Sequence, residues 1–239
     1  MAKKVTRAKK AQVEKGNELL ENPEEIADRL QRGELFIKKN SKIVGGAIIA
    51  LILVIAGILY FQIDRQNKNK TAQAEMFQAV YYYEQDSLEF AINGDGSNPG
   101  FLDIINRYKG TDAANLSHYY LGSIYLSERE FQKAVDHLEK FSSDDYFVQA
   151  KAYALIGDAY FELKNIDKAI SNYDKAAKYR PNKFFTPRYL MKLAVAYEEA
   201  GQLNKAIEAY GRIEQEYFES YEFTAARKHK ARLEGLASN

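Results

Sequence analysis

The chain has no cysteine and no tryptophan, and only 4 of its 239 residues are proline and 3 are histidine. Without cysteine the protein forms no disulfide, thiol nucleophile, cysteine-ligated zinc site or iron–sulfur cluster, and no lipid is attached to an N-terminal cysteine. The low proline content, with abundant Ala, Leu, Lys and Glu, favours an all-α protein. A large net charge is also missing. The formal net charge of +1 argues against a protein that mainly coats nucleic acid.

One apolar run interrupts this polar sequence. Residues 43–63 contain no charged side chain, and Gln62 is the only strongly polar residue among them. A helix of this length spans about 30 Å, which matches the hydrocarbon core of a bilayer. Tyr60 and Phe61 follow at its far end, where aromatic side chains meet headgroups. We expect an uncleaved transmembrane helix rather than a buried core helix or a signal peptide, because the preceding charged segment is too long and no small-residue cleavage site follows.

The flanking charges predict an orientation. Residues 1–42 hold eleven basic and seven acidic side chains, so this leader carries +4 and the rest of the chain −3. Basic segments remain preferentially in the cytoplasm. We therefore predict a cytoplasmic leader at residues 1–42 and a translocated domain at residues 64–239.

The leader contains a basic arm followed by a helix. The arm includes Lys3, Lys4, Arg7, Lys9 and Lys10. Such a segment is usually solvated and attracted to anionic lipid, and a contact with the ribosome is the alternative. A helix is predicted from an N-cap at Asn22, with Pro23 in its first position and Glu25 completing a capping box. Ile26, Leu30 and Ile37 share one side of it, so this helix either lies on the membrane or runs into the span.

Small residues gather on one face of the predicted span. Gly46, Ala50 and Gly57 lie close together around the helix, and small side chains let a second membrane helix approach closely. We interpret them as a packing surface, with the general glycine content of membrane helices as the alternative.

Internal repetition is the strongest pattern in the chain. Three segments share a small residue in one helix, a following tyrosine and an alanine in the next helix. The matching sets are Gly122, Tyr125 and Ala134; Gly157, Tyr160 and Ala169; and Ala194, Tyr197 and Ala206. The first interval is 35 residues and the second is 37. This pattern resembles the tetratricopeptide repeat (TPR), a helix–turn–helix unit of 34 residues.

With the span predicted above, the resemblance implies an all-α fold in which one transmembrane helix is followed by a TPR α-solenoid. Three clear repeats are expected at about 115–148, 150–183 and 187–220, with a degenerate leading repeat at 71–112 and a capping helix at 221–237. Stacking of successive repeats supplies the core, because no repeat buries its apolar face alone. Since no turn signal follows residue 63 until the first repeat, we expect the transmembrane helix to run on into it.

No residue pattern predicts catalysis, a cofactor, a metal or a small-molecule substrate. His118 is expected to pack within its repeat, while His137 and His229 have no partner at ligand spacing. Residues 93–100 lack the glycine and glutamate of a calcium loop, so we interpret them as a flexible turn between helices. No nucleophile–base pair is apparent, and we predict that the protein is not an enzyme.

The TPR resemblance instead implies a partner-binding groove along the first helix of each repeat. The corresponding residues are Tyr119, Ser123, Leu126, Asp158, Phe161, Glu162, Met191, Val195 and Glu198. Repeats that clamp a terminal carboxylate need Lys and Asn where this chain has Ser123, Asp158 and Val195. An extended or helical peptide segment is therefore the predicted ligand. In the alternative interpretation, Leu126, Phe161 and Met191 belong to the core between repeats.

The order of leader, span and repeats over residues 23–239 resembles the ancillary SecYEG translocon subunit family (YfgM-type). The resemblance implies an accessory or chaperone-like scaffold in the bacterial inner membrane, with its repeats in the periplasm. Its implied partners are SecYEG, emerging envelope proteins, and a periplasmic chaperone or prolyl isomerase. The alternative is a structural adaptor that assembles another envelope machine, for motility, secretion or division, without binding secretory clients.

Overall fold

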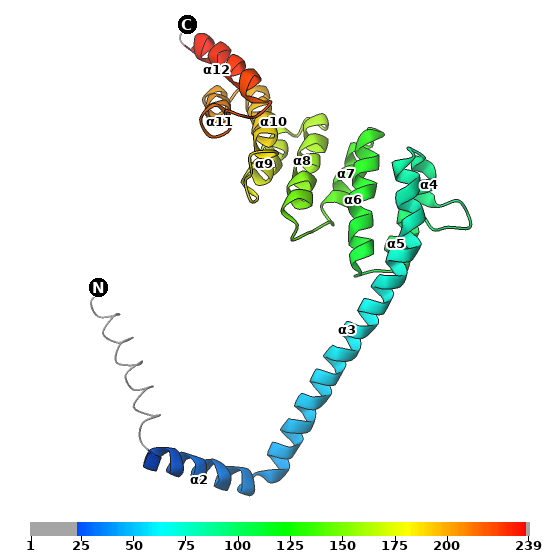
Figure 1. Ribbon diagram of the computed structural model, residues 1–239, viewed down its shortest axis with the longest axis vertical. Helices are drawn as coiled ribbons and strands as arrows, with labels where there is room; N and C mark the ends of the chain where they lie inside the picture. Colours follow the sequence, from blue (N-terminus) through cyan, green and yellow to red (C-terminus); the bar gives the residue numbers. More distant parts are fainter. Residues whose placement is uncertain (1–22, 238–239) are drawn as a thin grey trace. The chain divides into compact units, whose positions relative to one another are not determined.

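The computed structural model describes residues 23–237 (Figure 1). These residues form eleven α-helices and no β-strand, so the predicted all-α class is confirmed. The helices are α2 (Pro23–Lys39), α3 (Ser41–Glu84), α4 (Leu88–Asn93), α5 (Phe101–Arg107), α6 (Asp112–Ser127), α7 (Phe131–Leu138), α8 (Tyr146–Glu162), α9 (Ile166–Lys178), α10 (Thr186–Glu199), α11 (Leu203–Glu216) and α12 (Phe223–Ala237). Asn22 and the basic arm (Lys3, Lys4, Arg7, Lys9 and Lys10) lie outside the described residues.

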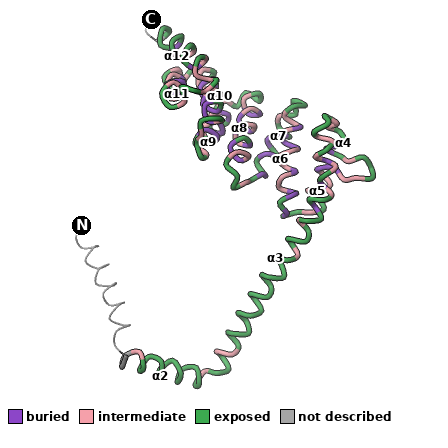
Figure 2. Tube along the Cα trace, in the orientation of Figure 1, coloured by how far each residue is buried: buried purple, intermediate pink, exposed green. Residues whose placement is uncertain are grey.

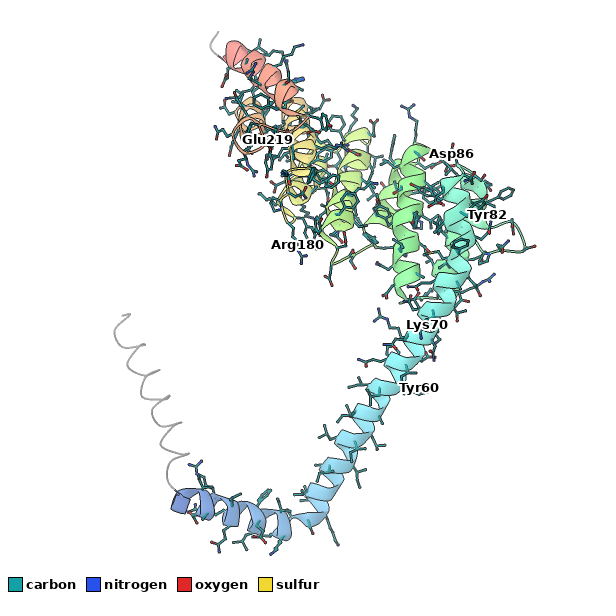
Figure 3. The ribbon with its side chains drawn as sticks, viewed as in Figure 1. Tyr60, Lys70, Tyr82, Asp86, Arg180 and Glu219 are labelled. Atoms are coloured by element: carbon teal, nitrogen blue, oxygen red, sulfur yellow. The ribbon has the colours of Figure 1, made fainter. Side chains whose placement is uncertain are left out.

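Two compact units divide the chain, residues 1–63 and residues 64–239. In the first unit, α3 contains one segment that is long and apolar enough to cross a membrane, and none of its most apolar stretch is buried. Tyr60 projects from this segment (Figure 3), with 76% of its surface exposed. As the missing turn signals predicted, α3 continues without a break to Glu84.

The second unit is a stack of helix pairs (Figure 1). Helix α6 packs on α7, α8 on α9, and α10 on α11, while α12 packs against α11. Side-chain caps start three of these helices: Thr111 accepts a hydrogen bond from the Ala114 N–H, Asp145 from Phe147 and Val148, and Asn165 from Lys168. Each cap satisfies a backbone donor that the first turn of a helix leaves unpaired.

Small residues set the distance between paired helices, as the repeat register predicted. A Cβ added at Gly122 would overlap the Leu138 side chain, which comes from the facing helix α7. Ala134, Ala169 and Ala206 are fully buried at the matching position of each second helix. The helices therefore approach to a separation that larger side chains at these positions would prevent.

One type of turn ends the first helix of every pair and also ends α3. In each case a backbone N–H donates to a tyrosine carbonyl five residues earlier: Ser87 to Tyr82, Glu130 to Tyr125, Asn165 to Tyr160 and Gln202 to Tyr197. The residue before each donor is left-handed, namely Asp86, Arg129, Lys164 and Gly201. Figure 3 labels Asp86 at the first of these turns. This geometry is the Schellman motif, and its recurrence gives α3 the same ending as the repeats.

The region after α3 departs from a regular helix pair. Two short helices, α4 and α5, are separated by a turn in which Gly94 and Gly96 have φ values of 81° and 89°. The Asp95 carboxylate accepts hydrogen bonds from the backbone of Ser97 and Asn98 and from the Tyr82 hydroxyl, at 2.5–2.8 Å. The predicted turn is present, but these hydrogen bonds hold it in one shape. They also lower the pKa of Asp95, the Tyr82 contact most strongly.

The core of the stack consists of two apolar clusters. The smaller one joins Ala72, Met76 and Ala79 of α3 to α4, α5 and α6. The larger one extends from α7 to α12 and includes fully buried Leu190 and Tyr210. Tyr125 packs against both clusters. The leading helices and the following repeats are therefore joined through α6.

Candidate partner-binding groove

The nine predicted groove residues lie on the first helices of three consecutive pairs. Helix α6 carries Tyr119, Ser123 and Leu126, α8 carries Asp158, Phe161 and Glu162, and α10 carries Met191, Val195 and Glu198. Glu162 and Val195 are exposed, while the other seven are partly buried. The structure brings some of these residues together and separates others.

Four of the nine line one hollow of about 190 Å³ between α8 and α10. Asp158, Phe161, Met191 and Val195 share this hollow with two residues that the sequence analysis did not assign to a site, Tyr173 and Lys192. Phe161 and Met191 also pack against the larger apolar cluster, as the alternative interpretation expected, and their role in binding stays a prediction. Val195 at the rim is 41% exposed. We call these six residues the inter-repeat hollow.

A charged centre lies inside this hollow. The Nζ of Lys192 donates to both oxygens of Asp158, at 2.6 and 2.8 Å, and the Tyr173 hydroxyl donates to Asp158 at 2.7 Å. Burial, and after it the nearby Asp158 carboxylate, raise the pKa of Tyr173 far above its ordinary range. Tyr173 therefore remains a neutral donor. The site combines an apolar rim with a polar centre. The Lys192 side chain in this centre is about one-third exposed.

Helical spacing could have identified Lys192. It lies three residues before Val195 and one after Met191, so it faces the same side of α10 as Val195. Its charge is also opposite to that of Asp158. The hydrogen bond from the Tyr173 hydroxyl to Asp158 could not be predicted from the sequence, because the repeat pattern requires an aromatic residue at this position for packing alone.

Glu198 is outside this hollow and binds the capping helix instead. Its carboxylate accepts a hydrogen bond from the Tyr210 hydroxyl at 2.7 Å, pairs with Arg232 of α12, and lies 3.8 Å from His229. Burial, followed by this hydrogen bond, raises the pKa of Tyr210. Glu198, the last predicted groove residue of the third repeat, therefore helps to hold helix α12 against the stack.

The three groove residues of α6 also lie outside the hollow. The Tyr119 ring packs at a tilt against the Phe141 ring, with centroids 5.2 Å apart, and the Lys151 Nζ lies 6.0 Å from the centroid of the Tyr119 ring. Leu126 packs against the larger apolar cluster. The Ser123 Oγ is buried, and no hydrogen-bond partner reaches it from the described part of the chain.

Two histidines that the sequence analysis treated separately form a pair. The Nδ1 atoms of His118 on α6 and His137 on α7 lie 3.1 Å apart. Burial lowers the pKa of both, and His137 and Lys140 help to lower that of His118 to about 4. Both imidazoles are therefore neutral near pH 7, and one donates to the other. Among residues 23–237 no group of three or more metal-ligating side chains is present.

The predicted packing surface of the span lies on the exposed side of the first unit. Ala50 is exposed, and a Cβ at Gly46 or Gly57 would meet no atom within 4 Å. No described helix occupies this stripe, so its role in packing stays a prediction.

Comparison with known protein families identifies the two segments that form the hollow. Models of the tetratricopeptide repeat family match residues 150–183 and 188–220. These segments are tetratricopeptide repeats. The first contributes Asp158, Phe161 and Tyr173 to the hollow, and the second contributes Met191, Lys192 and Val195. Repeats of this type form scaffolds for protein–protein interaction.

One curated relative also resembles the chain. The protein ycf37 of Guillardia theta is 28% identical over 116 residues, which cover 47% of this chain and 64% of ycf37. The chain therefore spans less than two thirds of the length of this relative.

Proposed function

We propose that the protein is a membrane-anchored scaffold that holds a peptide segment of a partner protein in the inter-repeat hollow. The Asp158–Lys192 pair within an apolar rim is the observation that carries this proposal. Phe161, Met191 and Val195 offer contact to an apolar side chain, while Lys192 and Asp158 offer hydrogen bonds to the peptide backbone beside it. The hollow lies where two repeats meet, the usual position of ligands on extended repeat surfaces.

The size of the hollow favours a peptide over a small-molecule ligand. Pockets for drug-sized molecules measure about 300–1,000 Å³, whereas this hollow measures about 190 Å³. It accommodates one large side chain of a longer segment. Further contacts then come from the exposed neighbours of the rim, such as Glu162.

The anchor in this proposal is the apolar segment at residues 43–63. Its length suits one passage through a bilayer, and the surplus of basic residues before it favours a cytoplasmic leader and a periplasmic TPR domain. The proposed location is the bacterial inner membrane, in a single-pass arrangement. The stripe of Gly46, Ala50 and Gly57 would then face another membrane helix.

The resemblance to the ancillary SecYEG translocon subunits supports a more specific role. We place the scaffold beside the Sec channel, where the hollow receives segments of emerging envelope proteins or docks a periplasmic chaperone or prolyl isomerase. In this arrangement the basic arm at the start of the leader reaches the ribosome. Deletion of residues 2–15 should then reduce ribosome association most strongly at low salt, and the difference from the intact protein should shrink as salt is raised, because salt weakens the ionic contact itself.

Photo-crosslinking from the full-length protein in native membranes tests this proposal. A crosslinker at Phe161 or Met191 should capture nascent envelope proteins, and SecY should co-purify in mild detergent. A crosslinker at Glu208, which is exposed on the second helix α11, is the matched control. Equal capture from Glu208 would reject the hollow as the binding site. Co-purification of motility, secretion or division components without SecY would instead favour the structural adaptor.

A further inference from the structure

Helix α2 has an apolar side that no described part of the chain covers. Leu30 and Ile37 are seven residues apart and therefore lie on the same side of the helix. They are 69% and 54% exposed. A Cβ at Gly33, between them on this side, would meet no atom within 4 Å. Figure 2 shows α2 exposed along nearly its whole length.

Charged pairs occupy other sides of α2. Arg32 pairs with Asp28 at 2.6 Å, and Lys38 pairs with Glu34 at 2.7 Å, each pair being one helical turn apart. Leu30 and Ile37 therefore lie opposite the Arg32–Asp28 pair, although exposed Leu35 also lies on that charged side. An amphipathic helix of this kind that packs on no protein is typical of the boundary between lipid and water.

The connection to α3 keeps α2 close to the proposed span. The Asn40 N–H donates to the Phe36 carbonyl at 3.0 Å, and the Asn40 carbonyl accepts from Ile43 and Val44 at 2.9 Å. The Asn40 side chain donates to the same Phe36 carbonyl at 3.0 Å. Lys39 ends α2 only four residues before Ile43, a distance of at most about 14 Å even in an extended chain. If residues 43–63 are in the bilayer, the end of α2 is at its surface.

We propose that α2 lies along the cytoplasmic surface of the membrane, with Leu30 and Ile37 inserted between lipids at the level where acyl chains begin. This inference rests on the membrane anchoring proposed above. Lys38, which flanks this side of the helix, would bury its aliphatic stem at this boundary and keep its ammonium group among the lipid phosphates. The occupant of the apolar side is thus the same bilayer that the neighbouring helix crosses.

A single introduced tryptophan can test the depth of each position, because the natural chain contains none. Leu30→Trp places the probe on the apolar side of α2. Gln31→Trp is the matched control, because consecutive residues of a helix point about 100° apart. Leu53→Trp marks the middle of the span. The three full-length variants are compared in vesicles of phosphatidylcholine and phosphatidylglycerol with brominated acyl chains.

In Leu30→Trp, bromine near the headgroups should quench the fluorescence, and aqueous iodide should quench it at least about threefold less than in Gln31→Trp. Equal iodide quenching in these two variants would overturn the surface position of α2. Protection from iodide without bromine quenching would also overturn it, and would indicate a protein on this face. If bromine near the bilayer centre fails to quench Leu53→Trp, the membrane anchoring itself is rejected.

Discussion

Lys192 of the third repeat and Asp158 of the second form an ion pair across the boundary between their repeats, with the Lys192 Nζ 2.6 Å from Asp158 Oδ1. The Tyr173 hydroxyl binds the same carboxylate from the second helix of its repeat. Three helices, α8, α9 and α10, therefore meet at one polar centre. This centre has both a structural role and a place in the proposed binding site.

Lys192→Met should lower the free energy of unfolding by about 1 kcal/mol, because it leaves a partly buried carboxylate with Tyr173 as its remaining partner. Urea unfolding of the full-length protein in mild detergent, followed by circular dichroism, measures this change. The control is Lys178→Met, which removes a more exposed pair with Asp174 within one helix. Its expected effect is at most about 0.5 kcal/mol, and equal losses in the two variants would contradict the prediction.

Gly157→Ala should destabilise the second repeat by about 1–3 kcal/mol through overpacking. The added Cβ would come within 2.6 Å of the Tyr173 ring, whose hydroxyl is held by Asp158. Thermal melts of the full-length protein measure the loss. In the control Gly211→Ala, the new Cβ lies 3.8 Å from the Lys230 Cε. That variant should be stabilised by up to about 1 kcal/mol, because alanine is the better helix former. A Gly157→Ala melt equal to wild type would refute the close approach.

The repeat register was predictable from the sequence because packing imposes it at a constant interval. Gly157 against Tyr173 and Gly122 against Leu138 are the same contact in consecutive repeats, so their residue types recur in the sequence. The turn between α4 and α5 was predicted from its composition, but its fixed shape had no such periodic signal. It depends on the Asp95 carboxylate binding Tyr82 of α3, a contact that occurs once in the stack and that no periodicity describes.

Arg129→Gly should stabilise the first clear repeat by about 0.5–1 kcal/mol. Arg129 has a φ of 64°, and a left-handed residue with a Cβ costs about 1–2 kcal/mol, part of which the greater chain entropy of glycine offsets. Gly201 occupies the matching turn of the third repeat with a φ of 68°. Gly201→Ala should therefore destabilise the protein by about 1 kcal/mol. Chemical denaturation of both variants checks the prediction, which fails if the two changes have the same sign.

The His118–His137 pair should make stability depend on pH. The folded-state pKa of both is lowered, for His118 to about 4, whereas an unfolded histidine titrates near pH 6.5. Lys140 opposes protonation of both imidazoles, and Asp136 favours that of His137. The unfolded chain therefore binds more protons, and the free energy of unfolding should fall from about pH 6.5 down to about pH 4.

Denaturation of His118→Asn over this pH range tests the histidine effect. Asparagine keeps a hydrogen-bonding nitrogen near the Nδ1 position but does not titrate, so the dependence on pH should be roughly halved. An unchanged slope would show that other groups cause it. Asp95, whose pKa is lowered, acts in a different range: its contribution is present above about pH 4 and is lost as the pH falls further.

The sequence predicted only part of the candidate site, because residue spacing describes contacts that recur in every repeat and not contacts that occur once. Family spacing assigned Asp158, Phe161, Met191 and Val195 to one groove, and the structure brings these four together in one hollow. Their role in binding stays a prediction. The spacing could not show that Glu198 binds Arg232 of the capping helix, because that contact depends on how the chain folds back after the last repeat. The same limit applies to His118 and His137, which are 19 residues apart and meet only when α6 and α7 pair.

The division of the core into two clusters has a mechanical consequence. Helix α3 belongs to the smaller cluster, and Tyr125 packs against both. If α3 is anchored in the membrane, tension between the anchor and a partner held in the hollow would pass through the smaller cluster. We expect this cluster to yield before the boundary between α8 and α10, because it contains fewer buried apolar side chains than the larger one. The leading helices would then act as a compliant spacer that allows a bound partner to move while it remains attached.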